Sequence, residues 1–343
     1  MTEVLAGLTG PFPRSEALVE VTRRVDRGLE PPASAERLYR SEADRIARRE
    51  AELKFAFVTG GFLPWPDLFR PWIEQTENLD AGPLSRWFQT NTFYRPPRVS
   101  GPLTRRPRGV LGTLPPLDPD PSGRPRGWVA PGPWTFARLC EDPGGKGTER
   151  LSRLWADRLA QEASALRAGG VGRLLLLEPS LVTDPPGPAE REGLRRAYRP
   201  LERVLTGPED GIWTFFGDAL PVLPLLSRLP GHLLGLDLTE TEPRRLKAFP
   251  RGKTLGLGVL DPRTSLPEEL PEIVSTVRAL VRRLSPSRVL LGPAASLDLL
   301  TGEAADKKLT VLARAAEVLN ASGTRASPRR APRRAPAVRR ARR

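Results

Sequence analysis

Short apolar runs alternate with amphipathic segments along most of this chain. Each run is almost continuously hydrophobic, and most runs close on glycine, proline or an acidic side chain. Continuous hydrophobicity is typical of parallel strands that are buried on both faces. The predicted strands are residues 4–10, 53–59, 127–132, 173–179, 212–218, 232–238, 253–261 and 287–293.

The segments between these runs carry apolar residues at helical spacing. The clearest are residues 148–168, 189–205, 267–284 and 304–320. About eight strands that alternate with helices predict an α/β fold, a (β/α)8 TIM-type barrel. A doubly wound sheet is the alternative, but no glycine-rich phosphate-binding loop of the GxGxxG or GxxxxGK[ST] kind follows any predicted strand.

The C-terminal end of the chain differs sharply in composition from the rest. Residues 321–343 hold nine Arg, no acidic residue and few apolar ones, so we expect a disordered tail behind a barrel domain of residues 1–320. The formal net charge is +14, but the first 320 residues contain 45 Lys and Arg against 40 Asp and Glu. A second irregular stretch, residues 103–126, is rich in Pro and Gly and predicts a long loop or hairpin.

The tail has two interpretations, which remain open. Its arginines would contact nucleic acid or another anionic surface non-specifically, or they would only solubilise the protein, and the second is slightly favoured. No apolar run is long enough to span a bilayer, and the N-terminus lacks a basic region followed by an apolar one. These features predict a cytoplasmic protein that does not bind membranes.

Cysteine and histidine are almost absent from the chain. Cys140 and His232 are the sole residues of their kinds, which excludes an intrachain disulfide and a Cys/His zinc cluster within the chain. A Cys–His nucleophile pair remains formally open. Packing roles are favoured, because Cys140 follows Leu139 in a predicted helix and His232 begins a predicted strand.

Polar residues close several of the predicted strands. In a barrel of this type ligands bind at the carboxyl ends of the strands, so these residues are the candidate site. Carboxylates and arginines around one mouth suit an anionic or amino-acid-like ligand, although each residue could instead cap a helix or form a salt bridge. The cap interpretation is strongest for Asp218, which directly precedes an apolar helical segment. The set is Arg14, Glu178, Asp218, Asp237, Asp261 and Arg263.

The strand ends, taken in order, resemble one barrel of the cobalamin-independent methionine synthase family. The most specific match is RWFQTNTFYRPP at 86–97, which is similar to a segment of the family's N-terminal barrel. The other matching segments are TGPFPRSEAL, APGPWTFARL, LLLLEPSL, WTFFGDAL, GLDLTE and KTLGLGVLDPRTS, which run in family order over residues 5–320.

The resemblance implies a chemistry that this chain does not carry in full. Full-length family members have two barrels in tandem, although single-barrel relatives also exist. In the C-terminal barrel a zinc ion held by His, two Cys and Glu binds homocysteine as a thiolate, which takes a methyl group from a methylated tetrahydrofolate. Here Trp213 and Phe215 stand where a catalytic barrel has His-x-Cys, Asp237 replaces the Glu, and Ala295 replaces the last Cys. We therefore expect no zinc cofactor and no zinc-thiolate catalysis by this chain alone.

Three functional hypotheses follow from this resemblance. In the first, the chain is a folate-binding or supporting subunit for a separate zinc-bearing barrel, although the same aromatics could merely fill the barrel mouth. In the second, it is a metal-free enzyme whose acid–base groups are Glu178, Asp237 and Asp261. In the third, it is a non-catalytic binding protein. The ligand-binding residues expected under the first are Arg14, Trp87, Asn91, Phe93, Tyr94, Trp213, Phe215, Asp218 and Arg263.

Overall fold

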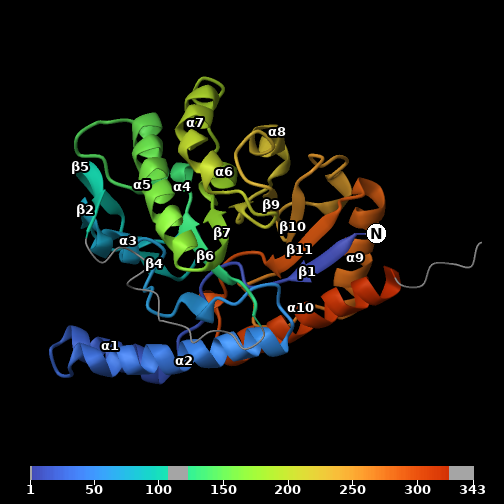
Figure 1. Cartoon of the computed structure of the whole chain (residues 1–343), viewed down its shortest axis with the longest axis horizontal. Coiled ribbons are helices and arrows are strands. Elements are labelled where there is room, and N and C mark those ends of the chain that lie inside the picture. Colours follow the sequence, from blue (N-terminus) through green and yellow to red (C-terminus); the bar gives the residue numbers. More distant parts are fainter. Residues whose placement is uncertain (1, 107–122, 324–343) are drawn as a thin grey trace, which may run out of the picture.

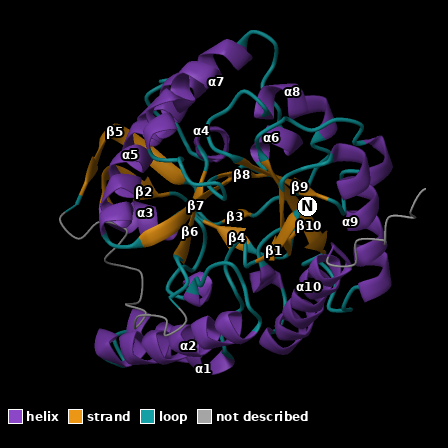
Figure 2. Ribbon diagram, turned by 45° about the vertical axis from the view of Figure 1, so that its right-hand side comes forward, coloured by secondary structure: helices purple, strands orange, loops and turns teal. Residues whose placement is uncertain are grey.

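A computed structural model describes residues 2–106 and 123–323 of the chain. Within these ranges seven parallel strands form one curled sheet in the order β1-β11-β10-β9-β8-β7-β6, and helices surround it (Figure 2). The predicted α/β barrel is confirmed. The strands are β1 (Glu3–Ala6), β6 (Arg126–Pro131), β7 (Val171–Leu177), β8 (Gly211–Trp213), β9 (Leu233–Asp237), β10 (Thr254–Leu260) and β11 (Arg288–Pro293).

An irregular segment, residues 55–58, takes the eighth position of the barrel. Ala56 N–H donates to Ala6 O at 2.9 Å, and Val58 N–H donates to Pro125 O at 3.1 Å, so the segment joins β1 to β6. The predicted regular strand at 53–59 is wrong, because Lys54 has a positive φ of 56° and Val58 forms an isolated bridge. Closure through this segment excludes the doubly wound alternative.

Two of the expected helices are confirmed closely, and two differ in extent. The 148–168 prediction is α5 (Thr148–Ala168), and 267–284 is α9 (Leu270–Leu284), which starts late because an extended Glu269 precedes it. The 189–205 segment divides into α7 (Glu190–Tyr198) and a 3-10 turn η3 (Arg199–Arg203). Residues 304–320 lie in α10 (Gly302–Gly323), which continues past position 320. The rest of the expected tail, 324–343, lies outside the described residues.

The loops at the barrel mouth carry additional elements (Figure 1). After β1 comes a helical hairpin, and after residues 55–58 come short helices and two small antiparallel pairs, β2 with β5 and β3 with β4. The expected loop at 103–126 begins as the end of β5, and its centre, 107–122, lies outside the described residues. These elements are α1 (Glu16–Asp26), α2 (Pro32–Glu52), η1 (Gly60–Phe62), α3 (Arg70–Gln75), β2 (Thr76–Ala81), β3 (Ser85–Arg86), β4 (Phe93–Tyr94) and β5 (Pro97–Arg105).

Shorter helical turns complete the mouth and outer layer. They include α4 (Pro133–Leu139), α6 (Ser180–Thr183), η4 (Leu220–Val222), α8 (Leu223–Leu226), η5 (Pro243–Arg245) and η6 (Leu297–Leu299). Within the described ranges no helix is both long enough and apolar enough to cross a membrane.

Large side chains fill the interior of the barrel. The Trp213 indole is fully buried, and its Nε1–H donates to Ala294 O at 2.9 Å. The ring of Phe57 is also buried, and the guanidinium of Arg173 lies 3.8 Å from its centroid. The barrel centre is therefore a packed core rather than a channel, as is usual for this fold.

Candidate functional site

A pocket of about 240 Å³ lies at the carboxyl ends of the strands. Its walls come from the loops that follow β1, η1, β8 and β11, together with the β3–β4 hairpin. This is the end of the barrel where ligands are expected to bind. The aromatic lining residues are Phe12, Phe62, Trp65, Trp87, Phe93, Tyr94, Phe215 and Phe216, and the charged ones are Arg14, Asp67 and Asp298.

The aromatic walls are connected rings rather than isolated side chains. Trp87 contacts Tyr94 edge-on with ring centroids 5.4 Å apart. Phe88 joins this pair to the next rings, because it lies 4.8 Å from Trp87 and 5.7 Å from Phe216, and Phe216 lies 4.9 Å from Phe215. Such contacts hold the rings in fixed orientations, so the pocket offers preformed flat surfaces to a ligand.

Three phenylalanines around the pocket have left-handed backbone conformations. Phe62, Phe88 and Phe216 have φ angles of 53°, 48° and 66°. A bulky side chain is rare in this region, because its Cβ crowds the neighbouring carbonyl. Local structure must therefore hold each of them there, and such strain concentrates at functional sites.

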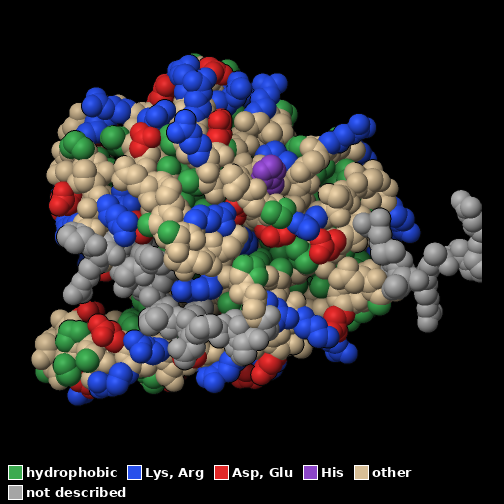
Figure 3. All heavy atoms as spheres, viewed as in Figure 1, with side chains coloured by type: hydrophobic (Ala, Val, Ile, Leu, Met, Phe, Trp, Pro, Cys, Tyr) green, Lys and Arg blue, Asp and Glu red, His purple; other side chains and the backbone are tan. Residues whose placement is uncertain are grey.

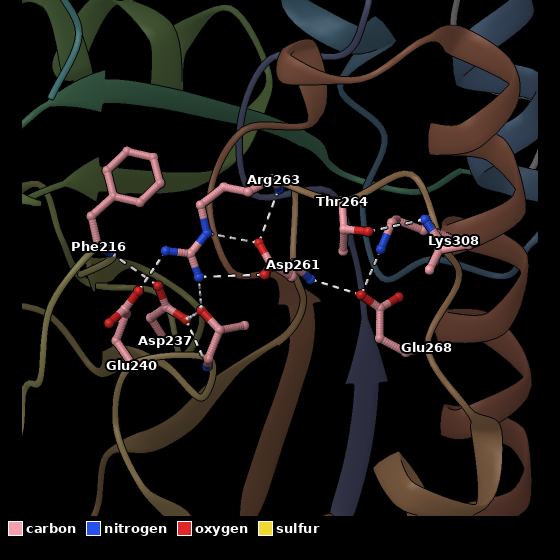
Figure 4. A network of polar contacts seen from close by, with 10 residues as sticks. Phe216, Asp237, Glu240, Asp261, Arg263, Thr264, Glu268 and Lys308 are labelled. Atoms are coloured by element: carbon pink, nitrogen blue, oxygen red, sulfur yellow. Dashed lines mark hydrogen bonds and ion pairs between the residues drawn. The ribbon is translucent and has the colours of Figure 1, made fainter. Parts of the chain in front are cut away.

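Asp237 supplies the support for Phe216. Its buried carboxylate accepts the Phe216 N–H at 3.0 Å, and also the backbone N–H and hydroxyl of Thr239 at 2.8 and 2.6 Å (Figure 4). Burial raises the pKa of Asp237, and these hydrogen bonds oppose that rise. Asp237 does not line the pocket. It acts on the pocket through the backbone of Phe216.

Arg263 lies in a polar network beside Asp237 and not in the pocket (Figure 4). Its guanidinium pairs with Asp261 at 2.9 Å and with Glu240 at 2.5 Å. The two carboxylates raise the pKa of Arg263, and Arg263 lowers the pKa of Asp261. These ion pairs neutralise the charge of Arg263 and hold two neighbouring loops together.

Glu178 is fully buried and already saturated with donors. Its carboxylate accepts the backbone N–H groups of Trp134 and Thr135 at 3.0 and 2.8 Å, and the Thr135 hydroxyl at 2.7 Å. It also accepts the hydroxyl of Tyr198. Burial raises the pKa of Glu178 to about 7. It binds the first turn of α4 and does not reach the pocket.

Four of the expected ligand-binding residues, as well as Phe93, meet in the pocket, and four do not. Arg14, Trp87, Tyr94 and Phe215 line it. Asn91 is exposed at the tip of the β3–β4 hairpin, and Trp213 is buried below the pocket. Asp218 accepts the Leu220 N–H at 3.0 Å and pairs with Arg245 at 3.2 Å, while the N-cap position of η4 is Ala219, which makes no side-chain cap. Arg263 is the fourth, because its guanidinium is paired with Asp261 and Glu240 outside the pocket.

Comparison with known proteins identifies the family. The profile described as "Cobalamin-independent synthase, N-terminal domain" matches residues 74–285, which is more than half of the chain. The chain belongs to the cobalamin-independent methionine synthase family. Its match is to the N-terminal domain of that family, in agreement with the resemblance seen in the sequence.

Curated relatives of the family are much longer than this chain. The 5-methyltetrahydropteroyltriglutamate–homocysteine methyltransferase of Mycobacterium bovis BCG is 32% identical over 214 residues, which are 60% of this chain but 27% of the relative. The enzyme of the same name from Herpetosiphon aurantiacus is 28% identical over 225 residues, 64% of this chain and 29% of the relative. The matched regions thus span less than a third of these methionine synthases.

Solved structures of methionine synthases share the fold over nearly the whole chain. A B12-independent methionine synthase from Shewanella sp. W3-18-1, in complex with selenomethionine, has a TM-score of 0.71 at 17% identity and covers 93% of this chain and 98% of its own. A vitamin-B12-independent methionine synthase from Listeria monocytogenes, described as putative, has a TM-score of 0.68 at 16% identity, with the same coverage.

The four residues that the sequence resemblance matches to zinc-ligand positions do not form a set of zinc ligands here. Trp213, Phe215 and Ala295 have no thiolate or imidazole, and Asp237 is occupied by backbone and hydroxyl donors. Zinc needs about four N, S or O ligands in tetrahedral array. Within residues 2–106 and 123–323, no three His, Cys, Asp or Glu side chains come together in a way that could hold a metal ion.

Cys140 and His232 do not form a nucleophile pair at this site. Cys140 caps the end of α4, and burial raises the pKa of its thiol to about 12. His232 is exposed just before β9, at the opposite end of the barrel from the pocket.

Some pocket residues were missed in the sequence. Phe62, Trp65, Phe216 and Asp298 line the pocket but were not predicted. Phe216 adjoins the predicted Phe215, and Asp298 lies five residues beyond the strand end at Pro293. The rule that ligands bind beyond strand ends would have reached both, had it been extended past the first polar residue.

Proposed function

We propose that the chain is a folate-binding or supporting barrel of methionine biosynthesis, which works with a separate zinc-bearing catalytic barrel. The names of its curated relatives state a methylated folate and homocysteine as their reactants. Because this chain matches less than a third of their length, those reactants come to it only as part of this proposal.

The observation that carries the proposal is the aromatic pocket with Arg14 at its side. A pterin ring is flat and would stack on Trp87 and Tyr94, with Phe215 and Phe216 as further contacts. Arg14 would bind an acidic group such as a glutamate carboxylate by two parallel hydrogen bonds. Another small anionic ligand with a flat ring would be held by the same contacts.

The proposal assigns no zinc chemistry to this chain. Side chains without a thiolate or imidazole at positions 213, 215 and 295 favour this division of labour, in which the methyl transfer occurs on the partner barrel. Elemental analysis of the purified protein tests it. We expect well under one zinc per chain and no change in thermal stability on chelation, whereas stoichiometric zinc would refute the division.

Ligand titration tests the binding role directly. We expect 5-methyltetrahydrofolate to quench tryptophan fluorescence with a saturable isotherm, and Trp87→Leu to weaken the affinity by at least tenfold. Leu266→Ala changes an exposed side chain outside the pocket and serves as the matched control. No saturable binding by the unmodified chain would refute the folate-binding role.

The metal-free enzyme and the binding protein are the remaining candidates. An enzyme that uses Glu178 and Asp237 is less favoured, because both carboxylates are engaged by protein donors and neither lines the pocket. A role in nucleic-acid binding rests on the arginine tail. Figure 3 shows Lys and Arg side chains interspersed with Asp and Glu on one face of the body. Deleting residues 321–343 would separate such binding from the barrel.

A further inference from the structure

Two opposite charges face the pocket from adjoining loops. Arg14 follows β1, and Asp298 lies in η6 after β11, the strand that pairs with β1. The loops are joined where Leu297 N–H donates to Pro11 O at 3.0 Å. A Cβ built on Gly10 would be 2.6 Å from Ser296 Oγ, so the two loops pack closely at that point. Arg14 and Asp298 are thereby placed by the barrel rather than by a mobile tip.

The remaining ionisable side chains of the pocket are already engaged. Asp67 accepts the backbone N–H groups of Phe69 and Arg70 at 2.8 and 2.9 Å, and that of Arg95 at 3.3 Å. The hydroxyl of Tyr94 donates to Leu139 O at 3.4 Å. Arg14 and Asp298, in contrast, form no side-chain hydrogen bond or ion pair with another residue of the described ranges, although the Asp298 carboxylate accepts its own backbone N–H and feels the charge of Arg14.

We propose that Asp298 is the residue that recognises the ring of the ligand, by accepting N–H groups from its edge. An ionised carboxylate takes two parallel N–H donors, so it fits the amino and ring N–H groups that a 2-amino-4-oxo heterocycle presents side by side. Phe216 and Trp87 contact the faces of that ring, and Arg14 binds an acidic group on the same molecule. This assignment rests on the proposed function and names the specificity of the same pocket.

The size of the pocket supports this ligand class. At about 240 Å³ it is smaller than the roughly 300–1,000 Å³ of sites that enclose a drug-sized ligand. A bicyclic ring fits this volume at Asp298, and the acidic group of a glutamate tail is left to Arg14 on the adjoining loop. The pocket thus separates ring recognition from tail recognition, and the two can be measured with two fragments of one ligand.

The ionisation of Asp298 gives the proposal a pH signature. Asp298 is an exposed residue, yet desolvation of its carboxyl by the surrounding protein raises the pKa to about 6, while Arg14 acts in the opposite direction. The other ionisable groups that line the pocket are Asp67 and Tyr94, and burial raises the pKa of both. Because the charged form of Asp298 accepts the ring N–H groups, affinity for the ring falls as pH drops through 6.

The test uses the full chain and three probes: 5-methyltetrahydrofolate, pterin, and 4-aminobenzoylglutamate, which has the tail but no pterin. We expect Asp298→Asn to weaken the binding of 5-methyltetrahydrofolate and of pterin by at least tenfold at pH 7.5. The affinity for 4-aminobenzoylglutamate should not change. Arg14→Met should show the reverse preference between the two fragments. Glu303→Gln, which changes an exposed carboxylate on α10, is the control.

The pH profile provides a second readout. Between pH 7.5 and 5 the affinity of the unmodified chain for pterin should fall about tenfold, and that of Asp298→Asn should stay flat. If 5-methyltetrahydrofolate binds and Asp298→Asn binds pterin as tightly as the unmodified chain does, the assignment of Asp298 is overturned while the proposed function stands. If none of the three probes binds the unmodified chain, both are overturned.

Discussion

The indole of Trp213 occupies the space that a side chain on Gly235 would need. A Cβ built on Gly235 would lie 2.1 Å from Cε3 of the indole, and one on Gly256 would lie 2.7 Å from Cζ3. These glycines belong to β9 and β10, the next two strands of the sheet after β8. Trp213 and the glycines therefore specify one another, and the tryptophan forms a solid layer in the barrel.

Gly235→Ala should destabilise the protein strongly. Overpacking of a dense core typically costs about 1–3 kcal/mol, and the overlap with the indole is severe. In urea denaturation, Gly235→Ala combined with Trp213→Leu should lose less stability than the sum of the two single changes. Gly302→Ala, where a Cβ meets no atom within 4 Å, is the control and should be nearly neutral. Additive losses at 235 and 213 would contradict the mutual fit.

Glu178 should make the protein more stable in mild acid. Its pKa is raised from 4.5 to about 7 in the folded state, so the stabilisation is fully present below pH 4.5 and is lost as pH rises through 7. Between pH 5 and 8 the titration of this one group lowers the free energy of unfolding by about 2–3 kcal/mol. Unfolding measured across that range should show the step in the unmodified chain, reduced by that amount in Glu178→Gln and retained in Glu303→Gln.

At position 216 glycine should give a more stable protein than alanine, the reverse of the usual order. With φ at 66°, alanine in its place keeps the steric strain, while glycine removes it at a gain of about 1 kcal/mol. Phe216→Gly should therefore be more stable than Phe216→Ala, although both lose the ring and should bind 5-methyltetrahydrofolate more weakly.

Two positions serve as comparators for Phe216. Ser285, at a φ of 49° after α9, should show the same order of stability without any effect on binding. Ala160, inside α5, should show the opposite order, because glycine weakens helices. If Phe216→Ala proves the more stable of its pair, the strain interpretation is wrong.

Arg14 and Arg263 should differ in their effect on binding. Arg14→Met removes the cation that lines the pocket and should weaken 5-methyltetrahydrofolate at least tenfold. Arg263→Met breaks partly exposed ion pairs outside the pocket, so its stability loss should stay within about 1 kcal/mol and binding should not change. Equal effects of the two substitutions on affinity would contradict the placement of the site.

The strands were predictable because they are buried on both faces. Continuous apolar runs such as 173–179 and 287–293 would expose apolar side chains to water anywhere but in a strand covered on both faces, and both form strands. The run at 53–59 has the same composition, but it closes the barrel between two neighbours through scattered backbone bonds. Whether a buried run pairs regularly depends on those neighbours, and they come from distant parts of the chain.

The binding residues were less predictable than the strands. Arg14 and Arg263 both follow a predicted strand, yet one faces the pocket and the other is paired with Asp261 and Glu240. Glu178 read as a catalytic acid because it closes a strand, and it is instead buried against the start of α4. The position of a residue after a strand predicts that it lies at the barrel mouth. Which charged group it pairs with depends on tertiary contacts, which the sequence pattern does not show.

The pairing of β1 with β11 has a consequence for how the chain folds. Hydrogen bonds such as Thr9 Oγ1–H to Pro293 O join residues 284 positions apart, and Asn320 of α10 also contacts the backbone of Val4. β1 is synthesised long before β11, so its edge stays uncovered until β11 has been made. Contacts of such long range make folding slow. We therefore expect the early hairpin of α1 and α2 to form first, and the seam between β1 and β11 to close last.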